Sequence, residues 1–136
     1  MLPEPFQEYS GTLAQYLQNA REHLAKGEAQ KASEMLWGAA AQMAKAIASL
    51  QGLDLSSHRD IRRYVTNLAR ESSDPRLLEL FDSVERLHRN FYDFDIEMSE
   101  MELYLRRTED FLGKMQSIGR AYLEMRQRSQ KSIGKG

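Results

Sequence analysis

The stretch "EMLWGAAAQMAKAIASLQG", residues 34–52, decides the fold, because it describes a helix that is apolar around most of its circumference. One stripe at helical spacing consists of Ala32, Leu36, Ala39, Met43, Ala46 and Leu50, and a second stripe beside it consists of Trp37, Ala40, Ala41, Ala44 and Ala48. The polar strip that remains is narrow and consists of Gln42, Lys45 and Ser49 with Gly38. A helix with so little polar surface must be enclosed by neighbours. The sequence therefore predicts a central helix at about 28–50, with Gly52 as its stop signal.

A second helix is expected before the central one, at about 5–26. Its apolar residues recur at intervals of three and four and are Phe6, Tyr9, Leu13, Tyr16, Ala20 and Leu24. Gly27 is suited to the left-handed residue that follows a helix, and Glu28 begins the next helix at once. The two helices should therefore form a tight antiparallel hairpin.

Three more helices are expected after the central one. Ser57 is the predicted N-cap of the third helix, with Asp60 in its first turn, and Asp74 is the predicted N-cap of the fourth helix, before Pro75. The fifth should start after Ser99, in a capping box with Glu102, and end at about Arg126. Its stripe is Met101, Tyr104, Thr108, Phe111, Met115, Ile118, Tyr122 and Met125. A helix this long should project beyond the bundle, and a second copy of the chain is the expected cover for its apolar surface.

Length and composition favour one globular domain. The chain has 136 residues, 41% hydrophobic and 29% charged, with three prolines and no cysteine. Without cysteine, disulfides, zinc–thiolate sites and a cysteine nucleophile are excluded. We expect an all-α protein, an up-and-down bundle of four to five helices over residues 1–125, followed by a basic tail over 126–136. The tail carries Arg126, Arg128, Lys131 and Lys135 without an acid. It is expected to be mobile, with phosphate contact as the alternative.

The charge and the N-terminal residues indicate the compartment and limit the partners. A net charge of −1 argues against a strongly basic surface over the whole domain. The segment "MLPEPFQEYSG" lacks a basic start followed by an apolar core, and no apolar run reaches the roughly 18 residues of a membrane span. A cytoplasmic protein without a membrane partner is the expectation.

The common catalytic motifs are missing from the sequence. There is no glycine-rich phosphate loop, no HExxH pair, no GxSxG elbow and no pair of Glu-x-x-His motifs. The three histidines, His23, His58 and His88, lie far apart in sequence. We therefore predict no catalytic residue, no metal and no cofactor.

The most suggestive polar cluster is "ERLHRNFYDFD", residues 85–95. In one interpretation, His88 is a hydrogen-bonded core or interface residue, as histidines on the flank of an apolar stripe often are. In the other, His88, Arg89, Asn90 and Tyr92 form one wall of a cleft that receives a phosphate or a base. The third helix would add His58 and Arg59 to this candidate binding site, and Arg62 and Arg63 could contribute charge.

Three segments resemble a known family: "AKGEAQKASEMLWGAAAQMAKAIA" at 25–48, "SHRDI" at 57–61 and "LHRNFYD" at 87–93. They are similar to PaREP-type helical domains, found mainly in archaea and related to the HEPN (higher eukaryotes and prokaryotes nucleotide-binding) superfamily, over roughly residues 10–120. The resemblance implies a HEPN-like bundle, commonly a homodimer. It also implies pairing with a minimal nucleotidyltransferase or a role in toxin–antitoxin or defence systems.

The same resemblance leaves three functional hypotheses, one of which is a purely structural partner that binds a protein such as a nucleotidyltransferase through the fifth helix or the basic tail. Many active members of the superfamily are metal-independent ribonucleases in which an Arg stands five to seven residues before a His. No histidine of this chain has that partner, because residues 16–18, 51–53 and 81–83 contain no arginine. The first hypothesis is thus a noncatalytic interaction module associated with RNA or nucleotides, acting as a homodimer or with a nucleotidyltransferase-like protein. The alternative is a metal-independent ribonuclease of toxin–antitoxin or defence type with a nonstandard active site.

Overall fold

The computed structural model of the chain describes residues 2–93 and 95–134, and the described part is all-helical, as predicted. Five α-helices are present, and a short 3-10 turn precedes the last of them. They are α1 (Glu4–Ala25), α2 (Ala29–Ser49), α3 (His58–Glu71), α4 (Pro75–Asp93), η1 (Met98–Glu100) and α5 (Met101–Gly134).

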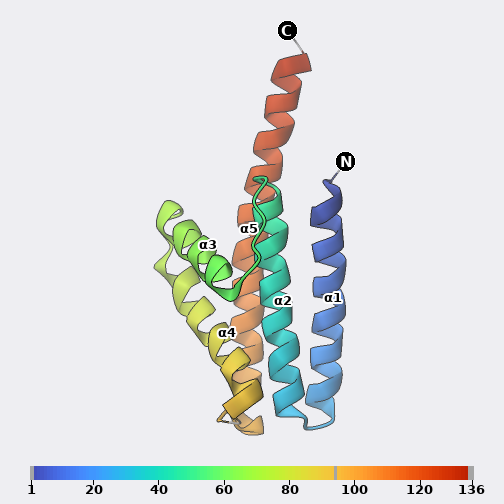
Figure 1. Ribbon diagram of the computed structural model, residues 1–136, viewed down its shortest axis with the longest axis vertical. Helices are drawn as coiled ribbons and strands as arrows, with labels where there is room; N and C mark the ends of the chain where they lie inside the picture. Colours follow the sequence, from blue (N-terminus) through green and yellow to red (C-terminus); the bar gives the residue numbers. More distant parts are fainter. Residues whose placement is uncertain (1, 94, 135–136) are drawn as a thin grey trace.

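The helices form one bundle in which α2 lies between α1 and the remaining elements (Figure 1). α1 and α2 pack as an antiparallel hairpin, and Gly27 between them has φ +74°, the left-handed conformation expected for it. α5 runs alongside α2, while α3 and α4 form a tilted hairpin on the side of α2 away from α1. Strict up-and-down alternation is interrupted once, because residues 50–57 run back along α2 before α3 begins.

The environment of α2 confirms that it is the central helix. Both of its apolar stripes are buried, and the side chains of the polar strip, Gln42, Lys45 and Ser49, are only partly exposed. At Gly38 the ring of Tyr16 on α1 lies close to the α2 backbone, since a Cβ added there would stand 3.0 Å from that ring. Small residues on α2 thus let its neighbours approach its backbone.

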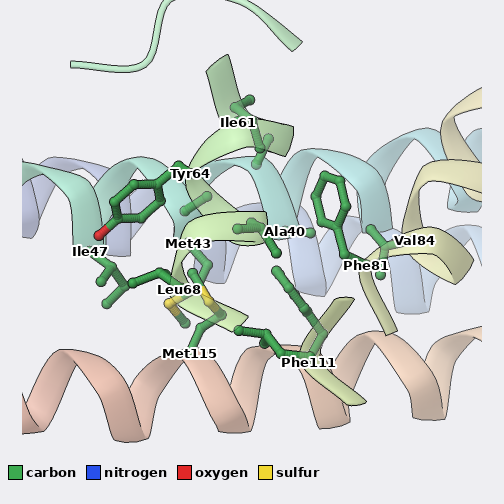
Figure 2. Close-up of a cluster of buried hydrophobic side chains, with 14 of the residues drawn as sticks. Ala40, Met43, Ile47, Ile61, Tyr64, Leu68, Phe81, Val84, Phe111 and Met115 are labelled. Atoms are coloured by element: carbon green, nitrogen blue, oxygen red, sulfur yellow. The ribbon is translucent and has the colours of Figure 1, made fainter. Parts of the chain in front are cut away.

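The main core lies between α2, α3, α4 and α5 (Figure 2). Phe81 of α4 and Phe111 of α5 meet at its centre, with ring centroids 5.8 Å apart. A smaller cluster fills the end near the α1–α2 turn and consists of Ala20, Ala32, Leu36, Leu87, Ile96, Met101 and Tyr104. Because both clusters include α2 residues, this helix connects the two parts of the core.

Two of the three predicted N-caps match the structure. Ser57 accepts a hydrogen bond from the Asp60 amide at 3.1 Å, and Asp74 directly precedes Pro75, the first residue of α4. Ser99 is not the cap of the last helix, because it lies inside the 3-10 turn Met98–Glu100, which leads directly into α5. The physical reason is that the 3-10 turn extends the helix by one turn toward its N-terminus, so the helical path already begins before Ser99.

The end of α5 also differs from the prediction. The helix continues past Arg126 to Gly134, so the boundary expected at Arg126 is too early. Arg126 itself donates a hydrogen bond of 3.4 Å to the carbonyl of Leu50, at the end of α2. The side chains of Lys131 and Lys135, which belong to the predicted basic tail, lie outside the described residues.

Candidate nucleic-acid interface

The outer face of α3 is an open groove rich in arginine. Its volume is about 700 Å³, and its lining consists of His58, Arg59, Arg62, Arg63, Thr66, Asn67 and Arg70. We call this surface the α3 groove. It concentrates four guanidinium groups on one helix of a chain whose net charge is only −1.

The amphipathic sequence of α3 turns the arginines outward. The residues of its inner face are buried and are Ile61, Tyr64, Val65, Leu68 and Ala69. The groove residues occupy the intervening positions at spacings of three and four, which place side chains on one face of a helix. The same apolar packing that attaches α3 to the bundle therefore exposes its arginines.

An aromatic cluster adjoins the groove at the start of α3. Trp37 of α2 is buried, and its ring centroid lies 4.7 Å from that of His58 and 5.0 Å from that of His88, on which it stacks. The ring centroids of the two imidazoles are 5.4 Å apart, and the Tyr92 ring meets the His88 ring edge-on with a centroid distance of 5.7 Å. We call these four residues the Trp37 cluster. Tyr92 is 66% exposed, so it presents an aromatic surface to solvent.

Carboxylates hold both imidazoles. His58 donates from Nε2 to Glu85 at 2.6 Å, and His88 donates from Nδ1 to Glu34 at 3.3 Å. Each imidazole therefore has one nitrogen bonded to an acid, while its second nitrogen has no such carboxylate contact among the described residues.

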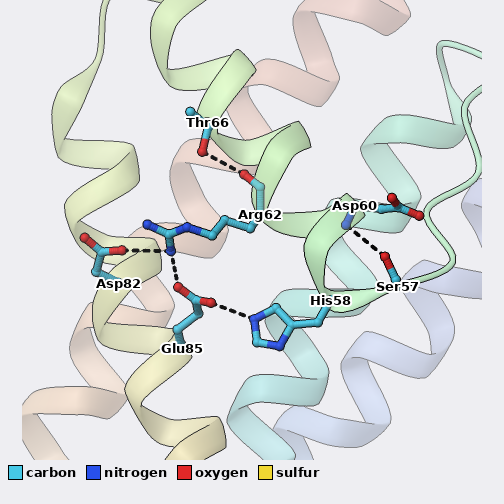
Figure 3. A network of polar contacts seen from close by, with 7 residues as sticks. All are labelled: Ser57, His58, Asp60, Arg62, Thr66, Asp82 and Glu85. Atoms are coloured by element: carbon cyan, nitrogen blue, oxygen red, sulfur yellow. Dashed lines mark hydrogen bonds and ion pairs between the residues drawn. The ribbon is translucent and has the colours of Figure 1, made fainter.

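Glu85 also connects the histidine to an arginine of the groove. Arg62 donates to Glu85 and to Asp82, the latter at 3.0 Å (Figure 3). The hydrogen bond to Asp82, together with the charges of Glu85 and Asp82, raises the pKa of Arg62 above its usual value. Arg62 is thus fully charged and already paired with α4.

The structure brings some of the predicted binding residues together and separates others. His58, His88 and Tyr92 meet in the Trp37 cluster, and Arg59 lines the α3 groove. Arg89 is exposed on α4 but is not part of the groove lining.

Asn90 has a structural position instead of a place on a cleft wall. It is 1% exposed, donates to the Ser33 hydroxyl at 2.9 Å and accepts from the Ile96 amide at 2.6 Å. It therefore connects α2 to the segment that follows α4. Its position on α4 is one residue from the exposed Arg89, and one residue changes the face of a helix by about 100°.

Sequence reasoning missed the carboxylate partners of both histidines. Glu34 is 54 residues from His88, and Glu85 is 27 residues from His58, so no local spacing links them. Arg70, by contrast, was accessible to sequence analysis: together with Arg59, Arg62 and Arg63 it forms a series at helical spacing.

Among residues 2–93 and 95–134, no three His, Cys, Asp or Glu side chains are grouped so that they could hold a metal ion. Within the same residues, no helix combines the length and the apolar character needed to cross a bilayer.

Fold and surface together define a five-helix bundle protein with an arginine-lined groove beside an exposed aromatic edge. The chain belongs to the archaeal PaREP1/PaREP8 family, whose profile matches residues 9–112. That range includes the whole α3 groove and the Trp37 cluster. No curated protein and no solved structure gives a significant match.

Proposed function

We propose that this protein is a noncatalytic module that binds single-stranded RNA, or a nucleotide, in the α3 groove. The observation that carries the proposal is the alignment of Arg59, Arg62, Arg63 and Arg70 along one open groove. Guanidinium groups bind phosphates with strong charge-assisted hydrogen bonds. A row of them at helical spacing suits successive phosphates better than a single anion.

The Trp37 cluster supplies the second element of such a site. Single-stranded nucleic acids bind through a positively charged groove combined with aromatic side chains on which bases stack. Tyr92 is the exposed aromatic residue, and it is connected to the groove through His88 and His58. We place phosphates over the arginines and a base against Tyr92.

Binding of a labelled oligouridine, measured by fluorescence anisotropy at several salt concentrations, tests this proposal. Arg63→Ala should weaken binding about three- to tenfold and reduce the salt slope by about 0.7, the value for one phosphate contact on a single strand. Arg21→Ala is the matched control, because Arg21 is an exposed arginine on α1, on the other side of α2. Equal losses in both variants would contradict the groove as the binding site. ATP and UMP as competitors separate a nucleotide site from an RNA site.

A metal-independent ribonuclease is the second candidate, and the pairing of His58 with His88 favours it. Ring centroids 5.4 Å apart, each imidazole oriented by a carboxylate, are compatible with one general base and one general acid. The base would take the proton of the RNA 2′-hydroxyl, whose oxygen attacks phosphorus. The acid would protonate the 5′-oxygen as its bond to phosphorus breaks.

Incubation of end-labelled RNA with the protein in EDTA distinguishes the two candidates. The noncatalytic proposal requires that RNA stay intact while it is bound. Cleavage that is lost in both His58→Gln and His88→Gln, with unchanged circular dichroism, would establish the ribonuclease instead.

The assembly and the location of the protein belong to the same proposal. We place it in the cytoplasm as a homodimer, or as the partner of a nucleotidyltransferase-like protein in a HEPN-like toxin–antitoxin or defence pair. Met125 of α5 is a 60% exposed apolar residue beside the end of α3, and its exposure supports a protein contact there. Light scattering of the purified chain measures the assembly directly.

A further inference from the structure

The four arginines of the α3 groove are not in equivalent environments. Arg62 is paired with Asp82 and Glu85 of α4. Arg59 and Arg63 have no carboxylate within 4.0 Å among the described residues, and the only side-chain hydrogen bond of Arg70 there goes to the Asn67 amide oxygen. The groove therefore has an open part and a part that the protein itself has neutralised.

The Glu85 carboxylate lies between His58 and Arg62, where a bound anion would lie. Its Oε2 accepts from His58 Nε2 at 2.6 Å, and its Oε1 accepts from Arg62, so the two oxygens span an imidazole and a guanidinium (Figure 3). A phosphate group offers the same arrangement of acceptor oxygens and a comparable or larger negative charge.

We infer that His58 and Arg62 form a phosphate subsite of the α3 groove, and that the Glu85 carboxylate occupies this subsite until a ligand phosphate displaces it. This inference rests on the proposed function, since it assigns the ligand chemistry and the self-inhibition of the same groove. Glu85 then lowers the affinity of the groove for phosphates, because the ligand must compete with a tethered carboxylate.

The surroundings of Glu85 allow such an exchange. His58 and Arg62 are the only side chains of the described part that bond to its carboxylate, and both belong to α3. α3 does not depend on this contact for its attachment, because five of its residues are buried in the apolar core. His58 also keeps its packing against Trp37. The carboxylate can therefore leave while the subsite keeps its shape.

Charge-neutral substitutions on α4 test the inference, with labelled oligouridine as the probe. Glu85→Gln should tighten binding about three- to tenfold, since an amide competes poorly for a guanidinium. Glu79→Gln is the matched control, because it removes the same charge from the same helix, where Glu79 pairs with Arg76 and not with the groove. It should change affinity less than twofold. Asp82→Asn, at a more exposed position, should give a smaller gain than Glu85→Gln and provides a second variant if the first is poorly folded.

A double substitution tests whether the gain in RNA affinity from Glu85→Gln depends on Arg62. In the wild type, Arg62→Ala should have a small effect on affinity, because the phosphate contact that Arg62 gains is offset by the Glu85 pair that it gives up. In the Glu85→Gln background the same change should remove most of the gain. A gain that survives without Arg62, or equal effects of Glu85→Gln and Glu79→Gln, would overturn the inference.

The failure of this inference can be told apart from the failure of the proposed function. If the wild type binds RNA through Arg63 but Glu85→Gln gives no gain, the binding site stands and the self-inhibition is wrong. If neither protein binds RNA, both are wrong. If Glu85→Gln tightens binding of polyglutamate but not of RNA, the subsite takes carboxylates and the assignment of phosphate is overturned.

Discussion

Helices α2 and α5 both have long apolar stripes, yet only α2 is enclosed over its whole length. On α5 the stripe is fully buried at Phe111 and Met115, partly buried at Ile118 and Tyr122, and 60% exposed at Met125. The cause is that α2 and α3 end at this level of α5, where Arg126 bonds to the Leu50 carbonyl, and α5 continues beyond its neighbours (Figure 1). A periodic stripe thus indicates which face of a helix is apolar, but not how far along that face other helices extend.

The largest expected effect on stability comes from replacing one apolar residue of each helix with alanine. Leu36 of α2 has no exposed surface, so Leu36→Ala should lower the free energy of unfolding by about 2–5 kcal/mol through lost burial and a cavity. Met125→Ala should change it by less than about 0.5 kcal/mol in the monomer. Urea denaturation of both variants measures the difference.

Repeating the urea denaturation at several protein concentrations shows whether a second copy covers α5. If a second copy covers α5, Met125→Ala will cost more at high protein concentration than at low, because association contributes to stability by mass action. A loss for Met125→Ala as large as that for Leu36→Ala under dilute conditions would contradict the contrast between the helices.

Glycine substitutions should have a smaller effect that differs between the two helices. A Cβ at Gly113 of α5 would meet nothing within 4 Å, so Gly113→Ala should stabilise the protein by about 1 kcal/mol through helix propensity. At Gly38 of α2 the added Cβ would press on the Tyr16 ring, so Gly38→Ala should give less stabilisation or a loss. Thermal melts of the two variants compare them, and an equal gain at both positions would show that α1 is free to move away from α2.

The smallest expected effect concerns the ion pair that attaches the first half of α5 to the start of α4. Lys114 donates to Asp74 at 2.8 Å, and this hydrogen bond is the main cause of the lowered pKa of Asp74. Asp74→Asn keeps a capping side chain and loses the ion pair, at a cost of about 0.2–1 kcal/mol near neutral pH.

The pH dependence of that cost has a definite sign. Because the pKa of Asp74 is lower in the folded state, its contribution is present above the unfolded value of about 4 and is lost as pH falls through the folded value. The difference between wild type and Asp74→Asn should therefore be constant from about pH 5 to 8 and shrink below about pH 4. A difference that grows on acidification would refute this assignment.

The helices were predictable because their signals are local. Gly27, Ser57 and Pro75 mark boundaries through backbone conformations and capping bonds that need no distant partner. Ser99 shows where such reasoning fails, since a plausible cap was displaced by an added 3-10 turn.

The site was predictable only in part. His58, His88 and Tyr92 were identified as candidate binding residues from sequence, and the structure brings them together. Asn90 was assigned to the same cleft but stands in the interior. Glu34 and Glu85 were missed, because ion pairs between helices depend on how those helices are placed.

The sequence by itself determined the all-α class, the central position of α2 and the outward direction of the α3 arginines. These properties follow from side-chain periodicity, which each segment carries alone. Only the tertiary structure decided that Trp37 packs between two histidines and that the Glu85 carboxylate accepts hydrogen bonds from His58 and Arg62. Those contacts join α2, α3 and α4, and their distances are determined by the packing of the whole core rather than by any one segment.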